Sequence, residues 1–238
     1  MQKTVVIMQP GYIPWLGFFE LLAQSDVFVL YDNVQYDKNG WRNRNRIKTP
    51  NGPLWLTVPV TLPNGLKTKI NEARIVQDGW RKKHIGSIAQ FYRQAPFLKE
   101  YFPEFKDLLE QKWETLIDLD IAAIKLFQKW LGNSSEIVRA SDLGIDEADK
   151  VERLINIVRH LGGNRFYEPA GGATYIKEAE LKRFQEAGIQ FEFQRYIHPT
   201  YRQLHGEFTP CLSILDLLLN EGPESSKILT STYQKEVA

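Results

Sequence analysis

The sequence has few cysteines and methionines, no long apolar run and almost no net charge. Cys211 is the single cysteine among 238 residues, so no disulfide can form within the chain, which is usual for proteins of reducing compartments. No apolar run has the length of a membrane-spanning helix or of the apolar core of a signal peptide. We therefore expect a cytoplasmic protein that does not insert into membranes.

The charge balance gives no indication of nucleic-acid binding. The chain has 30 Lys and Arg against 29 Asp and Glu, a formal net charge of +1. Proteins that bind nucleic acids through their phosphates normally carry an excess of basic residues. The hydrophobic share of 43% is ordinary for a globular protein, and a chain of this length folds without a metal or a disulfide. We expect no metal and no cofactor.

Both ends of the chain have an α/β pattern. The apolar runs at residues 5–8 and 27–31 predict two buried strands, joined by a turn rich in proline and glycine and a helix at 16–24. Strands and helices alternate again from residue 136 to a strand at 189–194. Near-continuous apolar strands joined by helices predict a mainly parallel, Rossmann-like sheet with helices on both faces.

The middle of the chain has a different pattern. Residues 32–57 are mostly polar, and we expect a loop there, followed by a strand at 54–60. Three helical patterns then cover residues 80–93, 97–112 and 113–131. We expect the second helix to be broken near Pro103. We predict a single α/β domain, 1–238, with a helical insertion at about 80–131.

The first candidate site segment, residues 9–18, leaves the first predicted strand. In a parallel sheet, ligands bind beyond the carboxyl ends of the strands, and this turn lies there. Its two glycines allow the backbone to approach a ligand closely. We predict substrate-binding roles for Gln9, Tyr12 and Trp15, with a stiff turn that buries its aromatic rings as the alternative.

The second segment, residues 32–46, mixes cations, amides and aromatic rings more densely than any other part of the chain. Arginine can hold a phosphate by two parallel hydrogen bonds, and aromatic rings offer flat faces to a planar ligand. Asp32 is a candidate catalytic proton acceptor. Single-stranded RNA is the alternative ligand for such a mixture. The predicted substrate-binding residues are Gln35, Tyr36, Lys38, Trp41, Asn43, Arg44 and Asn45.

The third segment, residues 196–216, follows the last predicted strand. His198 and His205 are seven residues apart, and no carboxylate or thiol stands at a matching offset, so a zinc site is not expected. We predict His198 as a catalytic base oriented by Asp216, with an ordinary hydrogen-bonding role as the alternative. All three segments are expected to meet in one pocket at the rim of the sheet.

Several strings of residues carry a resemblance to a known family. They are QPGYIPWLGFF at 9–19, DNVQYDKNGWRNRN at 32–45, HPTY at 198–201 and LSILDLLLN at 212–220. These strings are similar to those of the WbqC-like family of bacterial proteins, and the similarity extends over most of the chain. The family is associated with gene clusters for O-antigen and other surface polysaccharides.

The resemblance implies an enzyme of polysaccharide biosynthesis that modifies a sugar nucleotide. Its specific form is a transferase that attaches an acyl or aminoacyl group, such as glycyl, to the amine of an amino-sugar nucleotide. The expected partners are a nucleotide sugar and an aminoacyl donor. The alternatives are a non-catalytic nucleotide-sugar-binding protein, or a binder of RNA or aminoacyl-tRNA. Apart from tRNA in this last alternative, no nucleic acid is expected as a partner. The oligomeric state stays open.

Overall fold

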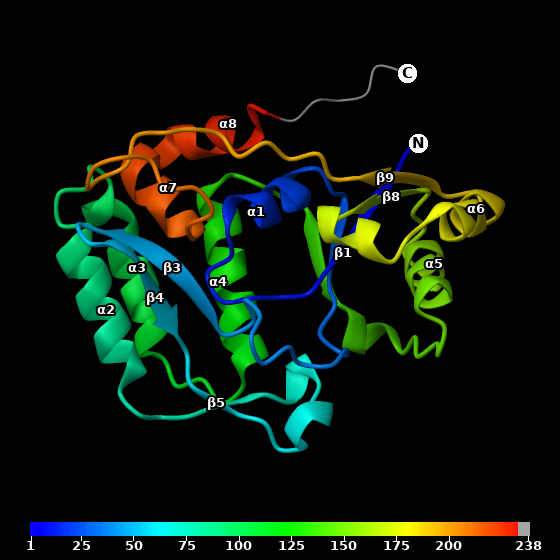
Figure 1. Cartoon of the computed structure of the whole chain (residues 1–238), viewed down its shortest axis with the longest axis horizontal. Helices are drawn as coiled ribbons and strands as arrows, with labels where there is room; N and C mark the ends of the chain where they lie inside the picture. Colours follow the sequence, from blue (N-terminus) through cyan, green and yellow to red (C-terminus); the bar gives the residue numbers. More distant parts are fainter. Residues whose placement is uncertain (233–238) are drawn as a thin grey trace.

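The computed structural model describes residues 1–232, and a five-stranded sheet lies at its centre (Figure 1). The sheet consists of β1 (Thr4–Met8), β2 (Val27–Leu30), β7 (Glu136–Arg139), β8 (Arg165–Glu168) and β9 (Gln190–Phe193). All its neighbouring strands are parallel, in the order β7-β2-β1-β8-β9. The predicted parallel, Rossmann-like sheet is therefore confirmed.

Helices cover both faces of this sheet. Side chains alternate along β1, so that Val6 points into one apolar cluster while Val5 and Ile7 point into the other. The cluster around Val5 contains α5 and α6, which lie together at one end of the molecule in Figure 1. The helices of this first cluster are α5 (Lys150–His160) and α6 (Glu178–Glu186). The cluster around Val6 contains residues of α1 (Leu16–Ala23), α4 (Leu116–Trp130) and α7 (Ile214–Glu221), and of the three further helices described below.

The helical block of the middle region packs into the larger of these clusters. It contains α2 (Trp80–Phe91), α3 (Leu98–Glu110) and α4. Helix α3 continues through Pro103, so the predicted break is wrong. Proline removes one backbone hydrogen bond, but Lys99, whose carbonyl is freed, and Pro103 are both exposed, and water can satisfy that carbonyl.

A hairpin occupies part of the region predicted to be a loop. Strands β3 (Arg44–Thr49) and β4 (Gly52–Thr57) are antiparallel, with Arg46 opposite Trp55. The inward face of β3 includes Asn45, a polar residue that is 1% exposed, so the alternation of apolar and polar residues is hidden in the sequence. The prediction of a loop over residues 44–49 was therefore wrong.

The remaining elements are short. Strands β5 (Val60–Thr61) and β6 (Arg74–Ile75) form a second small ladder, and α8 (Ser225–Thr230) ends the described part of the chain. Helix α5 begins at Lys150, where the Asp149 side chain accepts the hydrogen bond from the backbone N–H of Glu152. Within residues 1–232, no helix is long and apolar enough to cross a membrane.

The strand order shows where the sheet reverses its direction of winding. From β1 the chain builds outward through β2 and β7, and it then crosses to the other side of β1 to add β8 and β9. The direction of winding therefore reverses between β1 and β8. In open α/β sheets, ligands bind outside the carboxyl ends of the strands at such a reversal. The residues after Met8 and around Glu168 are accordingly the first place to look for a site.

Candidate functional site

Three segments that are far apart in the sequence meet at this rim, as the sequence predicts. The backbone N–H of Tyr12 donates to the carbonyl of Arg42 at 2.9 Å, which joins the turn after β1 to the loop before β3. The N–H of Ile214 donates to the carbonyl of Pro14 at 2.9 Å, which joins the same turn to the start of α7. The segments brought together are residues 9–18, 32–46 and 196–216.

Two glycines permit this close packing. A Cβ atom on Gly11 would lie 2.7 Å from the carbonyl oxygen of Trp41, closer than backbone atoms allow. A Cβ atom on Gly17 would lie 2.3 Å from the ring of Trp15. The indole of Trp15 therefore lies across the first turn of α1, and both glycines have a steric reason to be there.

Two cavities share a wall at the carboxyl end of β1. We call the first, of about 270 Å³, the aromatic cavity, and its lining includes Trp15, Trp41, Arg42, Asn45 and Cys211. The second, of about 330 Å³, lies at the reversal between β1 and β8, and we call it the carboxylate cavity; its lining includes Tyr31, Lys150, Glu168, Gly172 and Tyr175. Each is near the lower limit for a small-molecule pocket, so together they suit an elongated, two-part ligand. The shared wall consists of Met8, Gln9, Trp15 and Phe18.

Glu168 is the distinctive group of the carboxylate cavity. It is the last residue of β8, it is 3% exposed, and its Oε2 atom has no hydrogen-bond partner among the described residues. Its Oε1 atom accepts a hydrogen bond of 2.7 Å from the hydroxyl of Tyr175. Burial raises the pKa of Glu168 to about 7, against the lowering effects of the Tyr175 hydroxyl and of Lys150. A carboxyl group with such a pKa can accept or donate a proton near neutral pH.

The surroundings of Glu168 hold it in place. A Cβ atom on Gly172 would lie 2.2 Å from its Oε1 atom, so the short helical turn at residues 170–174 packs directly against the carboxylate. The Lys150 ammonium lies 3.4 Å from the centre of the Tyr175 ring, a close cation–π contact. A carboxylate, a phenol and an ammonium are therefore gathered at one wall, and the predictions from sequence included none of them.

The aromatic cavity has a buried cation in its wall. Arg42 donates from Nη1 to the carbonyl of Pro10 at 2.7 Å, while its Nε has no partner among the described residues. Asn45, a predicted binding residue, lines this cavity and donates from Nδ2 to the carbonyl of Ile13 at 2.8 Å. Arg42 was not among the predicted residues, because nothing in the sequence of the polar stretch distinguishes this buried arginine from the half-buried Arg44 and Arg46.

His198 lies against the cleft with both ring nitrogens engaged. Its ring stacks on Trp15 at 6.3 Å, which places it behind the shared wall. Nδ1 contacts the carbonyl of Pro199 at 2.8 Å, and Nε2 accepts from the backbone N–H of Cys211 at 3.2 Å. Because a carbonyl only accepts, Nδ1 carries the proton in this arrangement. Burial lowers the pKa of His198, so the ring is neutral and holds the Cys211 backbone in position.

Asp216 does not contact His198 through a hydrogen bond. Its two carboxylate oxygens accept from Tyr92 at 2.7 Å and from Tyr201 at 2.9 Å. Tyr92 also accepts from the backbone N–H of Lys48 at 3.0 Å, so this buried network ties β3, α2 and α7 to the segment that contains His198. The prediction that Asp216 orients His198 is therefore wrong.

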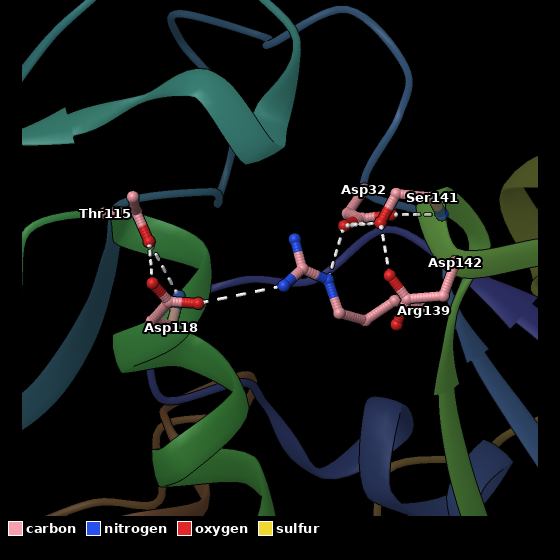
Figure 2. Close-up of polar contacts among 6 residues, drawn as sticks. All are labelled: Asp32, Thr115, Asp118, Arg139, Ser141 and Asp142. Atoms are coloured by element: carbon pink, nitrogen blue, oxygen red, sulfur yellow. Dashed lines mark hydrogen bonds and ion pairs between the residues drawn. The ribbon is translucent and has the colours of Figure 1, made fainter.

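Asp32, the other predicted catalytic residue, is fully buried and multiply bonded (Figure 2). Its carboxylate accepts from Arg139 Nε at 2.9 Å, from the Ser141 backbone N–H at 2.9 Å and from the Ser141 hydroxyl at 2.8 Å. The Arg139 guanidinium also lies 3.8 Å from Asp118 (Figure 2). Asp32 thus joins the ends of β2 and β7, and it lines neither cavity.

Two of the predicted binding residues lie in the core. Tyr12 is 0% exposed, and its hydroxyl is 2.9 Å from Nδ1 of His84. Tyr36 is 5% exposed, and burial raises its pKa to about 12. Neither residue lines a cavity. For Tyr12 the alternative interpretation holds, in which the turn buries its aromatic rings. Trp15 instead lies in the wall shared by the two cavities.

The other predicted residues of the polar segment line neither cavity. Gln35 and Lys38 are exposed. Asn43 donates to the carbonyl of Val58 at 2.8 Å, and Arg44 donates from Nη2 to the carbonyl of Asn39 at 2.6 Å. These side chains shape the loop before β3. Of the residues predicted as binding or catalytic, Gln9, Trp15, Trp41 and Asn45 line the cleft.

Among residues 1–232, no three or more His, Cys, Asp or Glu side chains are grouped as a metal ion requires. The model of the WbqC-like protein family matches residues 9–228. The chain belongs to the WbqC-like family. This WbqC-like protein is also 35% identical over 232 residues to the uncharacterized protein Rv1507c of Mycobacterium tuberculosis, an alignment that covers 95% of this chain and 97% of the relative. No solved structure matches the chain.

Proposed function

We propose that this WbqC-like protein binds a nucleotide-linked amino sugar in the two-part cleft and transfers an acyl or aminoacyl group to its amine. The observation that carries the proposal is Glu168, a buried carboxylate with an unpartnered oxygen at the point where the sheet reverses its winding. An amine that attacks an acyl carbon must lose a proton, and a positioned carboxylate near neutral pKa is a suitable acceptor. Membership of the family supports a role in surface-polysaccharide biosynthesis.

The proposed step is a simple exchange at one carbonyl carbon. The amine nitrogen of the sugar attacks the carbonyl carbon of an activated acyl donor, an ester or a thioester. A carbon–nitrogen bond forms, the bond to the ester oxygen or thioester sulfur breaks, and that atom leaves with the bonding electrons. The amine proton passes to Oε2 of Glu168, which then returns it to solvent or to the leaving group. The products are an amide and the free alcohol or thiol.

His198 and Asp32, the two catalytic residues predicted from the sequence, do not transfer a proton in this mechanism. His198 has no free ring nitrogen, and Asp32 is bound on both oxygens, so neither is placed to accept the amine proton. His198 instead supports Trp15, whose indole separates the two cavities. Gln9 lies in the same shared wall, where its amide can donate a hydrogen bond to the acyl oxygen.

A transfer assay tests the proposal. The purified protein is mixed with nucleoside diphosphate amino sugars and a glycyl thioester, and the amide product is measured by mass spectrometry. We expect Glu168→Gln to lose product formation while nucleotide sugars still raise its melting temperature as in the wild type. Glu136→Gln is the matched control, an exposed carboxylate at the amino end of β7.

Two outcomes would contradict the proposal. Binding without any product, in the wild type and with every acyl donor, would favour a non-catalytic nucleotide-sugar-binding protein. Equal product formation by the wild type and by Glu168→Gln would remove Glu168 from the mechanism. A loss of activity in both Glu168→Gln and Glu136→Gln would point to a general loss of structure, which the melting temperatures report.

A further inference from the structure

Two tryptophans stand half-exposed on the outer face of the β3–β4 hairpin and the loop before it. Trp41 is 43% exposed and Trp55 is 44% exposed, and their ring centres are 5.1 Å apart with a tilt of 40°. Neighbouring exposed aromatic side chains form a contiguous patch, which is the kind of surface that marks a ligand- or partner-binding site. They are neighbours in space although 14 residues apart in the sequence.

The hairpin register explains why two arginines join them. Residues 44 and 46 point to the same side of β3, and Arg46 is directly opposite Trp55 on β4. The Arg44 guanidinium carbon is 4.9 Å from the centre of the Trp55 ring. The Arg46 guanidinium carbon is 5.4 Å from the Trp41 ring and 5.6 Å from the Trp55 ring. We call these four side chains the tryptophan platform.

The tryptophan platform continues directly into the aromatic cavity. Trp41 is a member of the platform and also lines that cavity. Arg46 donates from Nη2 to the carbonyl of Cys211 at 3.1 Å, and Cys211 lines the same cavity. The Nε atom of Arg46 has no hydrogen-bond partner among the described residues. A ligand that fills the aromatic cavity would therefore meet the Trp41 ring at its mouth, next to the Arg46 guanidinium that binds the Cys211 carbonyl.

The same face of the hairpin is covered further along the strand. Lys48 follows Arg46 on this side of β3, but it is 2% exposed, because its ammonium is bound by the Gln203 side chain at 3.0 Å and the Glu207 carbonyl at 2.5 Å. The segment after β9 thus shields Lys48 and leaves the tryptophan platform open. The open part is limited to two rings and two guanidinium groups.

We infer that the tryptophan platform is the subsite for the nucleobase of a mononucleotide, with the attached phosphates beside Arg46 at the mouth of the aromatic cavity. Half-exposed aromatic rings offer faces to a planar base, and guanidinium groups bind phosphate oxygens by paired hydrogen bonds. This assignment rests on the proposed function, since the base and phosphates would be those of the nucleotide-linked sugar. Two rings accommodate one base, and a chain with a net charge of +1 lacks the basic excess of an RNA-binding surface.

Calorimetric titration of the full chain with UDP and with GDP tests the inference. We expect Trp55→Ala to weaken the binding of both nucleotides about 5- to 100-fold, the effect of losing one base–aromatic stack. Trp55→Phe keeps a ring and should stay close to the wild type. Trp130→Phe is the control, because Trp130 lies on α4 and contacts Tyr101 and Phe127, outside the platform. Melting temperatures of all variants show that each is folded.

The outcomes separate this inference from the proposed function. Equal affinity of the wild type and Trp55→Ala for both nucleotides, or no binding by the wild type, would overturn the platform assignment. Much tighter binding of a single-stranded oligonucleotide than of UDP or GDP, lost in Trp55→Ala, would also overturn it in favour of RNA. Nucleotide binding that depends on Trp55, without any acyl transfer, would support the inference while the proposed function fails. Transfer to glucosamine as efficient as transfer to its nucleotide-linked form, unaffected by Trp55→Ala, would overturn the inference alone.

Discussion

Glu168 should make the stability of the protein fall as the pH rises from about 4.5 to about 7. In the folded chain its pKa is raised from 4.5 to about 7, so between these values the folded state holds a proton that the unfolded state has lost. The contribution of Glu168 to the free energy of unfolding is therefore greatest below pH 4.5. It decreases between pH 4.5 and pH 7 and stays low above pH 7. The pKa values of the two states differ by about 2.5, which corresponds to roughly 3 kcal/mol.

The variant Glu168→Gln isolates this effect, because a neutral amide has no proton to lose. Its carbonyl oxygen can still accept the hydrogen bond that Tyr175 donates to Glu168. Between pH 5 and pH 8 the variant should gain about 2 kcal/mol or more relative to the wild type. For a chain of this length that is a relative rise of about 4–8 °C in the melting temperature.

The assay is a series of thermal melts from pH 5 to pH 8 for the wild type, Glu168→Gln and Glu136→Gln. The difference between the wild type and Glu168→Gln should change with pH, whereas the difference for Glu136→Gln should stay constant. A difference for Glu168→Gln that does not depend on pH would show that Glu168 ionises as in water. In that case the reason for assigning it the role of proton acceptor would be lost.

Three further substitutions test how the cleft is held together. Asp32→Asn removes the charge from three hydrogen bonds and should lower the free energy of unfolding by about 1–3 kcal/mol in urea titrations. Nucleotide-sugar binding should be retained. Loss of binding in a folded variant would show that Asp32 belongs to the binding site. Gly17→Ala should displace Trp15 and lower the free energy of unfolding by about 1–3 kcal/mol. It should also abolish the rise in melting temperature that nucleotide sugars cause. An unchanged rise would show that the wall shared by the two cavities has no role in binding. Tyr92→Phe leaves one Asp216 oxygen without its donor and should cost about 1–3 kcal/mol in the same titrations, whereas a change below about 0.5 kcal/mol would show that the buried network is weak.

The sheet could be predicted because its strands are buried on both faces. The runs at 5–8 and 27–31 are apolar at every position, and only a strand covered on both sides needs that pattern. The β3 strand was missed because its inward residues include Asn45, which satisfies its amide with the carbonyl of Ile13. Such a partner comes from a distant segment, and no local pattern indicates it.

The convergence of the three segments could likewise be predicted, since all of them leave the same rim of a parallel sheet. The state of each side chain could not. Asp32 and His198 are polar residues beyond strand ends, and Glu168 is the polar last residue of a strand. Only the tertiary structure determines that Arg139 and Ser141 bind Asp32 and that Glu168 has an unpartnered oxygen. Glu168 also follows two aromatic residues in a short strand, and nothing in those few residues indicates that its carboxylate is buried.

The position of the sugar amine can be determined in a crystal structure of the protein with a nucleoside diphosphate amino sugar. We expect the amine nitrogen within hydrogen-bonding distance of Oε2 of Glu168, with the sugar against Gln9 and Trp15. A ligand bound with its amine pointing to solvent, or bound away from the carboxyl ends of β1 and β8, would contradict this expectation.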